Sequence, residues 1–418
     1  MLEELFTYPF IINILNKLLN DYDKIIIISL NKFLFEKRLK IKFDEEIVCE
    51  PEDFNKWYYD CLTNIKVEKI FKFPKCVERL KFGDNFNQSI ENEISNSVTH
   101  LTFDFDFDQP INNCIPNSVT HLTFGDNFDQ PIIDSIPNSV THLNFGDSFD
   151  QDINNCIPNS VTHLNFGDSF DRDINNCIPN SVTHLNFGNN FDRSIIGSIP
   201  NSVTHLTFGC RFNQTFKDGI PNSVTHLTFG TLFRQNIQNC IPNSVTHLTF
   251  GNFFNKPIFD SIPNSVTHLK FGYKFNQLIQ NCIPNSVTHL SLGYDFNQNI
   301  ENCLTHLSNL THLHFGDCFN QSVKDNIPNS VTHLTFGRYF NKPIENYLPS
   351  SITHLKFGRS FDKSIDKLPD SVIFLELHHL YNHKINKIPQ NLKIIQTSEN
   401  FFNRYPKLKK FNAIIEFF

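Results

Sequence analysis

A repeat of 21 residues constrains this chain more than any other feature of its sequence. The string Ile-Pro-Asn-Ser-Val-Thr-His-Leu occurs ten times, and its first nine copies, from Ile115 to Ile283, start 21 residues apart. The tenth starts at Ile327, after one unit that is two residues longer. Degenerate copies extend the array from about Phe73 to about Ser398. Because so short a unit cannot close its own core, the units are expected to stack and share one.

Each unit predicts one strand and one corner. In the unit that starts at Ile115, Leu122 and Phe124 alternate with polar residues, which is the period of a β-strand. Gly125 follows, and glycine occupies this place in thirteen of fourteen units, with Asp104 as the exception. A recurring glycine indicates a bend that a Cβ would obstruct. We therefore predict a mainly β, parallel solenoid of about 14–15 coils, in which Val, Leu, both Phe and Ile point inward.

The pattern Val-x-x-Leu-x-Phe-Gly-x-x-Phe-Asn/Asp-x-x-Ile, followed by Ile-Pro, resembles the FNIP repeat family, a relative of leucine-rich repeats. The resemblance implies a curved, LRR-like solenoid with the Thr-His-Leu-Thr-Phe strand on its concave face. Leucine-rich repeats carry an Asn ladder after the strand. Here the residue after the second Phe is Asn or Asp in thirteen of fourteen units, with Arg234 as the exception. We expect this residue to form a buried ladder that satisfies backbone amides at the corner.

Thirteen histidines occupy one place in the repeat. If Leu122 points inward, His121 points outward, so the imidazoles should line one face at the spacing of adjacent strands. Neutral His is a common Zn or Cu ligand, but the column fixes no carboxylate or thiolate beside the rings, so we predict no metal and no cofactor. The alternative is a structural stack that bonds the adjacent Thr. Repulsion within it should lower the His pKa below about 6.5. The members are His100, His121, His142, His163, His184, His205, His226, His247, His268, His289, His312, His333 and His354.

Binding specificity is expected where the units differ, and the two residues after the corner glycine vary most. Acidic residues concentrate in the early units, Arg in the late ones, and aromatics between them. Exposed aromatic and Arg residues are typical of interaction hot spots, although a solvated corner that is free to drift would also vary. The candidate interaction surface combines these residues with the outward histidines: His121, His142, His163, His184, His205, His226, His247, His268, Phe253, Tyr273, Tyr294, Arg338, Tyr339 and Arg359.

Several classes of function are not supported. Ser, His and Asp recur in every unit, whereas a catalytic site needs one distinguished place, and no GxSxG, P-loop, GxGxxG or HExxH motif occurs. We therefore expect no catalytic residues and no enzymatic activity. The net charge of −7 argues against nucleic acid as a partner. The longest apolar runs fall short of the roughly 18 residues that span a membrane.

The cysteines indicate packing instead of cross-linking. Six of the eleven occupy one place in the repeat, where other units carry mostly small residues, as a thiol acting as a small hydrophobe would allow. They are Cys114, Cys156, Cys177, Cys240, Cys282 and Cys303. With no recognisable secretory signal and no CxxC pair, a reducing, cytoplasmic setting is expected.

The ends differ from the array. Residues 1–72 are expected to form a short helical N-terminal cap, residues 73–398 the solenoid, and residues 399–418 a C-terminal cap or tail. Tyr8-Pro9 through Asn31-Lys32-Phe33 resembles an F-box, which implies that residues 5–35 bind a ubiquitin-ligase adaptor while the solenoid holds a substrate. We predict a non-enzymatic protein–protein interaction scaffold of unknown partner. An F-box-like substrate receptor is the alternative, and a metal- or pH-responsive His column is the third interpretation.

Overall fold

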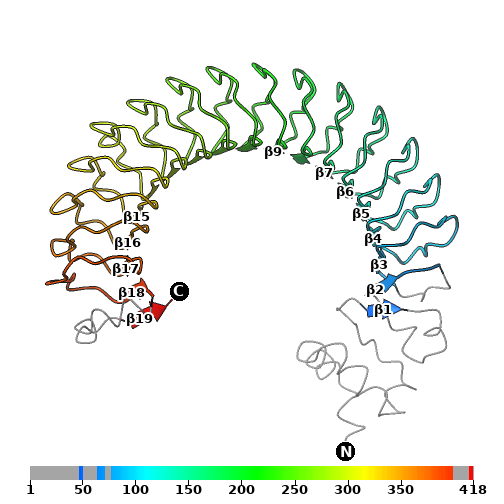
Figure 1. Cartoon of the computed structure of the whole chain (residues 1–418). Helices are drawn as coiled ribbons and strands as arrows, with labels where there is room; N and C mark the ends of the chain where they lie inside the picture. Colours follow the sequence, from blue (N-terminus) through cyan, green and yellow to red (C-terminus); the bar gives the residue numbers. More distant parts are fainter. Residues whose placement is uncertain (1–46, 50–63, 71–76, 399–413, 418) are drawn as a thin grey trace, which may run out of the picture. The chain divides into compact units, whose positions relative to one another are not determined.

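The computed structural model describes residues 47–49, 64–70, 77–398 and 414–417. The chain divides into two compact units, of which unit 1 ends at Phe191 and unit 2 begins at Asp192. Each unit is a stack of coils, and one short strand of every coil pairs in parallel with the strand of the next (Figure 1). Within the described ranges, no helix has the length and apolar character needed to cross a membrane.

Every strand is three or four residues long, and equivalent residues pair across coils, such as Leu122 with Leu143. Unit 1 holds β1 (Ile47–Cys49), β2 (Asn64–Val67), β3 (Arg79–Phe82), β4 (His100–Thr102), β5 (His121–Thr123), β6 (His142–Asn144), β7 (His163–Asn165) and β8 (His184–Asn186). Unit 2 holds β9 (His205–Thr207), β10 (His226–Thr228), β11 (His247–Thr249), β12 (His268–Lys270), β13 (His289–Ser291), β14 (His312–His314), β15 (His333–Thr335), β16 (His354–Lys356), β17 (Phe374–Glu376), β18 (Ile394–Thr397) and β19 (Ile414–Phe417). The predicted mainly β, parallel solenoid is confirmed.

The ladder extends into the ends of the chain. Strands β1 and β2 lie within the residues expected to form the N-terminal cap, and β2 pairs with β3. Ile65 and Val67 of β2 are fully buried, so this strand shares the core of the coils that follow. Strand β19 lies within the expected C-terminal cap or tail and pairs with β18. The helices and the F-box-like segment expected over Leu5–Phe35 lie outside the described residues.

The core repeats the same five inward side chains in each coil, as the pattern predicted. In one coil of unit 1, Val119, Leu122, Phe124, Phe128 and Ile132 are at most 2% exposed. The two Phe rings of this coil stack on each other with centroids 4.0 Å apart. Each ring also stacks on its equivalent in the next coil, so neighbouring coils share one continuous apolar core.

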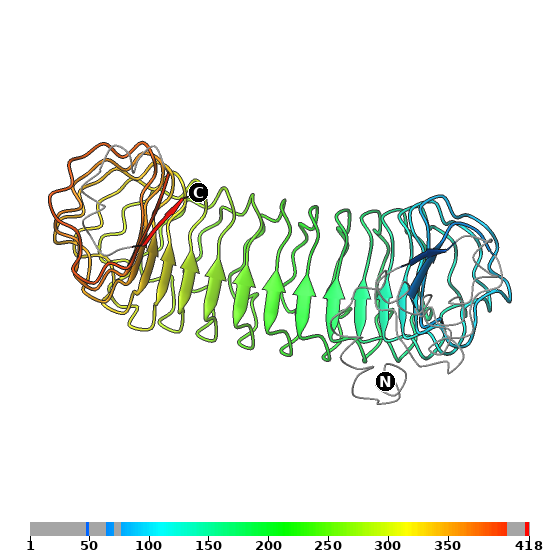
Figure 2. The ribbon, with the colours of Figure 1, turned by 90° about the horizontal axis from the view of Figure 1, so that it is seen from below.

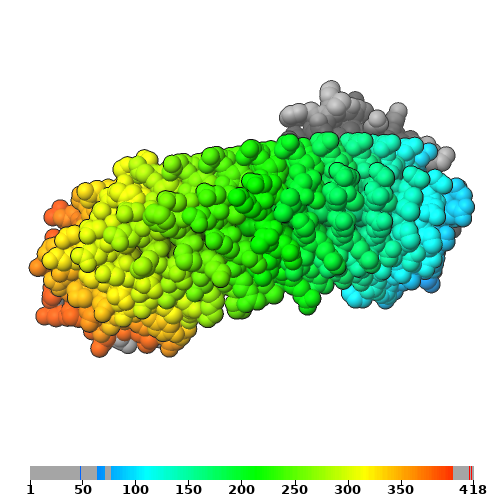
Figure 3. Space-filling model, turned by 90° about the horizontal axis from the view of Figure 1, so that it is seen from above, coloured from blue at the N-terminus to red at the C-terminus, as the bar shows by residue number. Residues whose placement is uncertain are grey.

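The spacing between coils increases with distance from the strands. Between the coils of β5 and β6, the His rings on the strand face are 4.2 Å apart, the first Phe rings 5.7 Å and the second Phe rings 6.2 Å. The coils therefore splay apart behind the sheet, which places the strands on the inner side of each unit (Figures 1 and 2). Figure 3 shows the side away from the strands, where successive coils lie side by side. The implied concave strand face is thus present in both units.

The corner glycine is required by a close approach between coils. A Cβ built on Gly146 would lie 1.9 Å from the carbonyl oxygen of Gly125, one coil earlier, and most of the other corner glycines likewise approach a carbonyl of the preceding coil. The backbone is left-handed at a different corner, where Asn113 has a φ of 56° and the Cys114 N–H donates to the Ile111 carbonyl. This second corner was not recognised in the sequence. Its signal was an Asn, Asp or Gly at that place in successive units.

Ser and Thr of the repeated Ile-Pro-Asn-Ser-Val-Thr-His-Leu string form hydrogen bonds between coils. Ser118 Oγ donates to the Val98 carbonyl at 2.6 Å, and Thr120 Oγ1 lies 3.2 Å from the Thr99 carbonyl. The Val119 N–H donates to the Pro116 carbonyl and closes the turn that precedes the strand. The Ser and Thr of the string thus each bond a backbone carbonyl of the preceding coil.

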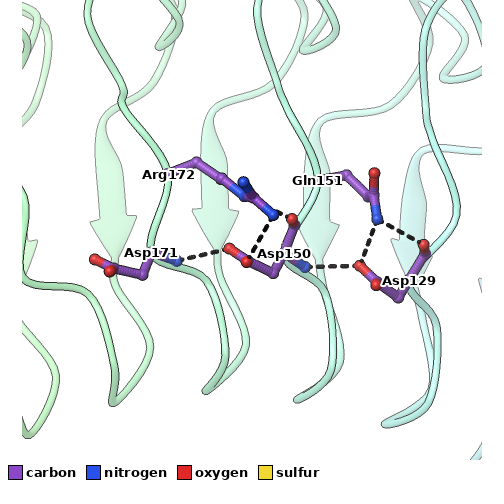
Figure 4. A network of polar contacts seen from close by, with 5 residues as sticks. All are labelled: Asp129, Asp150, Gln151, Asp171 and Arg172. Carbon is purple, nitrogen blue, oxygen red and sulfur yellow. Dashed lines mark hydrogen bonds and ion pairs between the residues drawn. The ribbon is translucent and has the colours of Figure 1, made fainter.

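The predicted Asn/Asp ladder is formed. Asp150 and Asp171 each donate a backbone N–H to the Oδ1 of the equivalent Asp one coil earlier, at 2.9 and 3.0 Å (Figure 4). Gln151 and Arg172, the next residues along, bond the same acceptors, Gln151 Nε2 to Asp129 Oδ1 at 2.9 Å and Arg172 Nη2 to Asp150 Oδ2 at 2.9 Å (Figure 4). The expectation that this ladder is buried was wrong. Its members are half-buried or exposed.

The longer unit keeps the strand register. Its two extra residues lie in the return segment, where Leu304, Leu307 and Leu310 are all fully buried. His289 of β13 still pairs with His312 of β14. An insertion behind the sheet therefore leaves the strand face unbroken.

Candidate interaction surface

The histidines form a stacked column on the strand face of each unit. Neighbouring ring centroids are 4.2 Å apart between His100 and His184 in unit 1. They are 4.1–4.2 Å apart between His205 and His354 in unit 2. All members are half-buried, because each ring covers the faces of its neighbours. The predicted outward orientation and stacking are confirmed.

Each ring is fixed by the threonine that precedes it. His121 Nδ1 lies 2.9 Å from Thr120 Oγ1, and the other members of the column repeat this contact at 2.9–3.0 Å. When the Thr120 hydroxyl donates to the Thr99 carbonyl, it accepts a hydrogen bond from Nδ1–H of His121. Nε2 is then the ring nitrogen that can accept a hydrogen bond. The Thr thus fixes both the position of the imidazole and the nitrogen that remains available.

The stack lowers the pKa of its histidines. Burial is the main cause, and the charge of neighbouring histidines adds to it, so the sequence-based emphasis on repulsion is corrected. The effect lowers the pKa of His333 to about 4. The pKa values of six further members are lowered: His100, His121, His142, His268, His289 and His312. These histidines are therefore neutral near pH 7.

The stacking geometry is unsuited to a metal. Within the described residues, no group of three or more His, Cys, Asp or Glu side chains is placed to hold an ion. Rings that lie face to face direct their nitrogen lone pairs side by side, whereas a zinc site needs several lone pairs that converge on one point. The Thr contact at Nδ1 occupies the second nitrogen of each ring.

A groove of about 390 Å³ runs along the strand face of unit 2, across β11 to β15. The His column forms one part of its lining, and the last residue of each strand forms another. That last residue is Thr or Asn in the strands β4 to β11, but changes to Lys270, Ser291 and His314 in β12 to β14. The lining includes His247, His268, His289, His312, His333, Thr249, Lys270, Ser291, His314 and Thr335.

Only two of the histidines proposed from sequence, His247 and His268, line this groove. The other six, His121, His142, His163, His184, His205 and His226, lie in the columns outside it. Sequence reasoning missed Lys270 and His314. Their signal was the change at the last strand position, which is exposed at both residues.

An aromatic and basic cluster forms the adjoining corner of unit 2, beside the ends of the strands. The rings of Tyr273 and Tyr294 stack 4.2 Å apart, and Lys274 lies 5.0 Å from the Tyr273 ring centroid. Arg338 lies 5.5 Å from the Tyr339 ring centroid. Hydrogen bonding with Tyr339, together with burial and Tyr273, raises the pKa of Tyr294 to about 12. This hydroxyl therefore stays protonated.

The remaining corner residues proposed from sequence are also exposed. Phe253 is 45% exposed, but within the described residues no ring contact joins it to the tyrosines. Arg359 lies close enough to His378 for its charge, after burial and His379, to lower the pKa of that histidine, and Arg338 contributes as well. The structure thus brings Tyr273, Tyr294, Arg338, Tyr339 and Arg359 to one corner.

The same corner in unit 1 is acidic. Asp126, Asp147 and Asp168 occupy the place that Tyr273, Tyr294 and Arg338 hold in unit 2. Burial and the charges of Asp168 and Asp126 raise the pKa of Asp147. Equivalent surfaces of the two units therefore differ in charge although their backbones repeat.

Comparison with known proteins agrees with this geometry. The FNIP repeat profile matches ten overlapping or adjoining segments that together cover residues 86–380. Among solved structures, the chain is similar to CroV588, described as a novel circular LRR protein structure, with 36% sequence identity and a TM-score of 0.62. That match covers 90% of this chain and 71% of the other. A comparison with curated proteins found no match.

Proposed function

The chain belongs to the FNIP repeat family, and from this premise we propose that it is a non-enzymatic protein–protein interaction scaffold that binds through the strand face of unit 2. The groove across β11 to β15 carries the proposal, because it is concave and its lining includes Lys270, Ser291 and His314, which differ from the residues at the same place in earlier coils. A short parallel ladder with a continuous core holds these side chains in fixed positions. Repeat solenoids use such extended concave surfaces for binding.

Filling the groove tests the proposal. Ser291 lines the groove and is half-buried, so Ser291→Trp should occupy its volume. Gln280→Trp places the same ring on an exposed turn of the return segment and serves as the matched control. Both variants and the unaltered chain are purified from cells, and their co-purifying proteins are quantified. We expect partners to be lost with Ser291→Trp and kept with Gln280→Trp. Equal recovery with both variants would exclude the strand face as the binding surface.

The F-box-like receptor stays a prediction, since residues 5–35 lie outside the described ranges. The same purification addresses it. Recovery of a ubiquitin-ligase adaptor that is lost on Leu15→Asp, in the segment that resembles the F-box, would support the receptor alternative.

A reducing, intracellular setting forms part of the proposal. Eight cysteines of the described residues, from Cys114 to Cys318, are free thiols. Cys156 and Cys177 hold equivalent places in consecutive coils, yet each Sγ contacts a carbonyl of its own coil, Asn154 at 3.2 Å and Asn175 at 3.3 Å. Such thiols act as small packing groups, which supports a compartment where cysteines stay reduced.

A further inference from the structure

We propose that the strand face and corner of unit 2 bind an acidic, extended peptide segment of a protein partner. This inference rests on the proposed function and specifies the chemistry of the partner. Three features carry it: an excess of exposed cations, the spacing of hydrogen-bond donors along the strands, and the aromatic rings beside them.

The charged side chains of this surface are mostly hydrogen-bond donors. Five exposed cations lie on β12, β16 and the adjoining corner: Lys270, Lys274, Arg338, Lys356 and Arg359. Two of them are neutralised, Lys274 by Asp295 at 2.9 Å and Lys356 by Glu376 at 3.0 Å. The other three have no ion pair within the described residues. A ligand that satisfies them must supply acceptors with negative charge, such as carboxylates.

The strand positions set the spacing of the ligand's acidic groups. Lys270, His314 and Lys356 occupy the last place of alternate strands, in register through Ser291 and Thr335. Burial lowers the pKa of His314, so this ring meets a carboxylate as a neutral N–H donor, and Lys356 shares its charge with Glu376. Parallel strands lie about 4.8 Å apart, so these side chains repeat at about 10 Å. An extended peptide advances about 3.3 Å per residue, so every third residue of a peptide crossing the strands would meet one of them.

The rest of the surface fits an extended peptide. The imidazoles beside the cations are neutral near pH 7 and offer ring edges to apolar side chains, and the stacked Tyr273–Tyr294 pair offers a ring face. Nucleic acid is disfavoured by the net charge of −7. Asp295 and Asp317 lie among the corner cations and would repel any anionic group close to them, so the acidic groups of the peptide are assigned to the strand positions. The acidic corner of unit 1 would repel the same peptide, which restricts the site to unit 2.

The test uses the full chain and a fluorescein-labelled peptide with Glu at every third position and Gln elsewhere. Binding is followed by fluorescence anisotropy at about 50 and about 200 mM salt, and it should weaken with salt. Lys270→Glu should weaken it by about tenfold or more. Lys256→Glu, an exposed lysine of unit 2 outside the groove, is the matched control and should leave affinity nearly unchanged. The melting temperatures of both variants are compared with that of the unaltered chain.

Four outcomes would overturn the proposal. They are no binding at low salt, equal weakening by both lysine variants, tighter binding of a single-stranded oligonucleotide of the same charge, and self-association abolished by Lys270→Glu. Such self-association would mean that the acidic corner of a second copy of the chain occupies the site. If the peptide fails while Ser291→Trp still removes cellular partners, the scaffold function stands and only the acidic chemistry is wrong.

Discussion

At the scale of single residues, the His column links packing to protonation. His289 is half-buried between its stacked neighbours, and burial lowers its pKa in the folded chain. Below the ordinary His pKa of about 6.5, the unfolded chain therefore binds more protons than the folded chain. The stabilising contribution of the neutral histidines should be complete above that pH. It should be lost as the pH falls through the pKa values of the folded chain, of which that of His333 is about 4. Asp147 has a raised pKa, so its contribution to stability changes with pH in the opposite direction.

Melting temperatures at about pH 7.5 and about pH 5, in one buffer system, test this prediction. The chain should melt at a lower temperature at the acidic pH. Replacing His289 and His312 by Gln should narrow the difference, because two of the groups with lowered pKa values are removed. Equal melting temperatures at the two pH values would contradict the prediction.

Arg234 marks the one break in the Asn/Asp ladder. Its own N–H donates to Asn213 Oδ1 at 2.9 Å, but its side chain gives no acceptor to the backbone of Asn255 in the next coil. Arg234→Asn should complete the ladder and raise the free energy of unfolding by about 1 kcal/mol. Arg211→Asn removes the same charge elsewhere and should change little. Chemical denaturation of both variants is the measurement, and an equal gain would assign the effect to charge.

At the scale of the coil, the glycine corner should be intolerant of a side chain. A Cβ on Gly251 would lie 1.6 Å from the Gly230 carbonyl oxygen, so a backbone shift would be needed. Gly251→Ala should destabilise the fold by about 2 kcal/mol or more. Gly219→Ala is the matched control, since its nearest atom is 3.1 Å away and equivalent coils carry Ser or Cys there. Thermal melts that show similar losses for both variants would contradict the close-approach explanation.

The features of the coil that a single repeat defines were predictable from sequence. Alternation around Leu122 gave the inward and outward faces, and repetition indicated the ladder at Asp129. The family resemblance implied a concave strand face, but the location of the groove was not predictable from sequence. The groove depends on coils of unit 2 that are closer at the His rings, 4.2 Å apart, than at the second Phe rings, 6.3 Å apart. Only this spacing makes the last strand residue, such as Lys270, part of a concave surface. Sequence variation at the corner did indicate Tyr273, but not its stacking on Tyr294.

At the scale of the whole molecule, coils should be removable one at a time. Deleting residues 157–177 removes β7 and one full period, which lets β6 meet β8 with every inward residue in register. The shortened chain should fold, with the same circular dichroism per residue and a modestly lower melting temperature. Deleting residues 144–163 instead leaves one extra residue inside the strand, which places Leu143 and Phe166 on opposite faces of the sheet. That variant should lose cooperative unfolding, and equal behaviour of the two deletions would contradict the stacking account.

The central claim is that the repeated residues build the solenoid while the residues that differ between coils bind the partner. It is tested most directly by giving unit 2 the residues of unit 1 through Lys270→Thr, Tyr273→Asp, Tyr294→Asp and Arg338→Asp. The measurement is the recovery of cellular partners, with the melting temperature of the same preparation. We predict that partners are lost while the melting temperature stays within a few degrees of the unaltered chain. Full recovery of the same partners by a folded variant would contradict the claim.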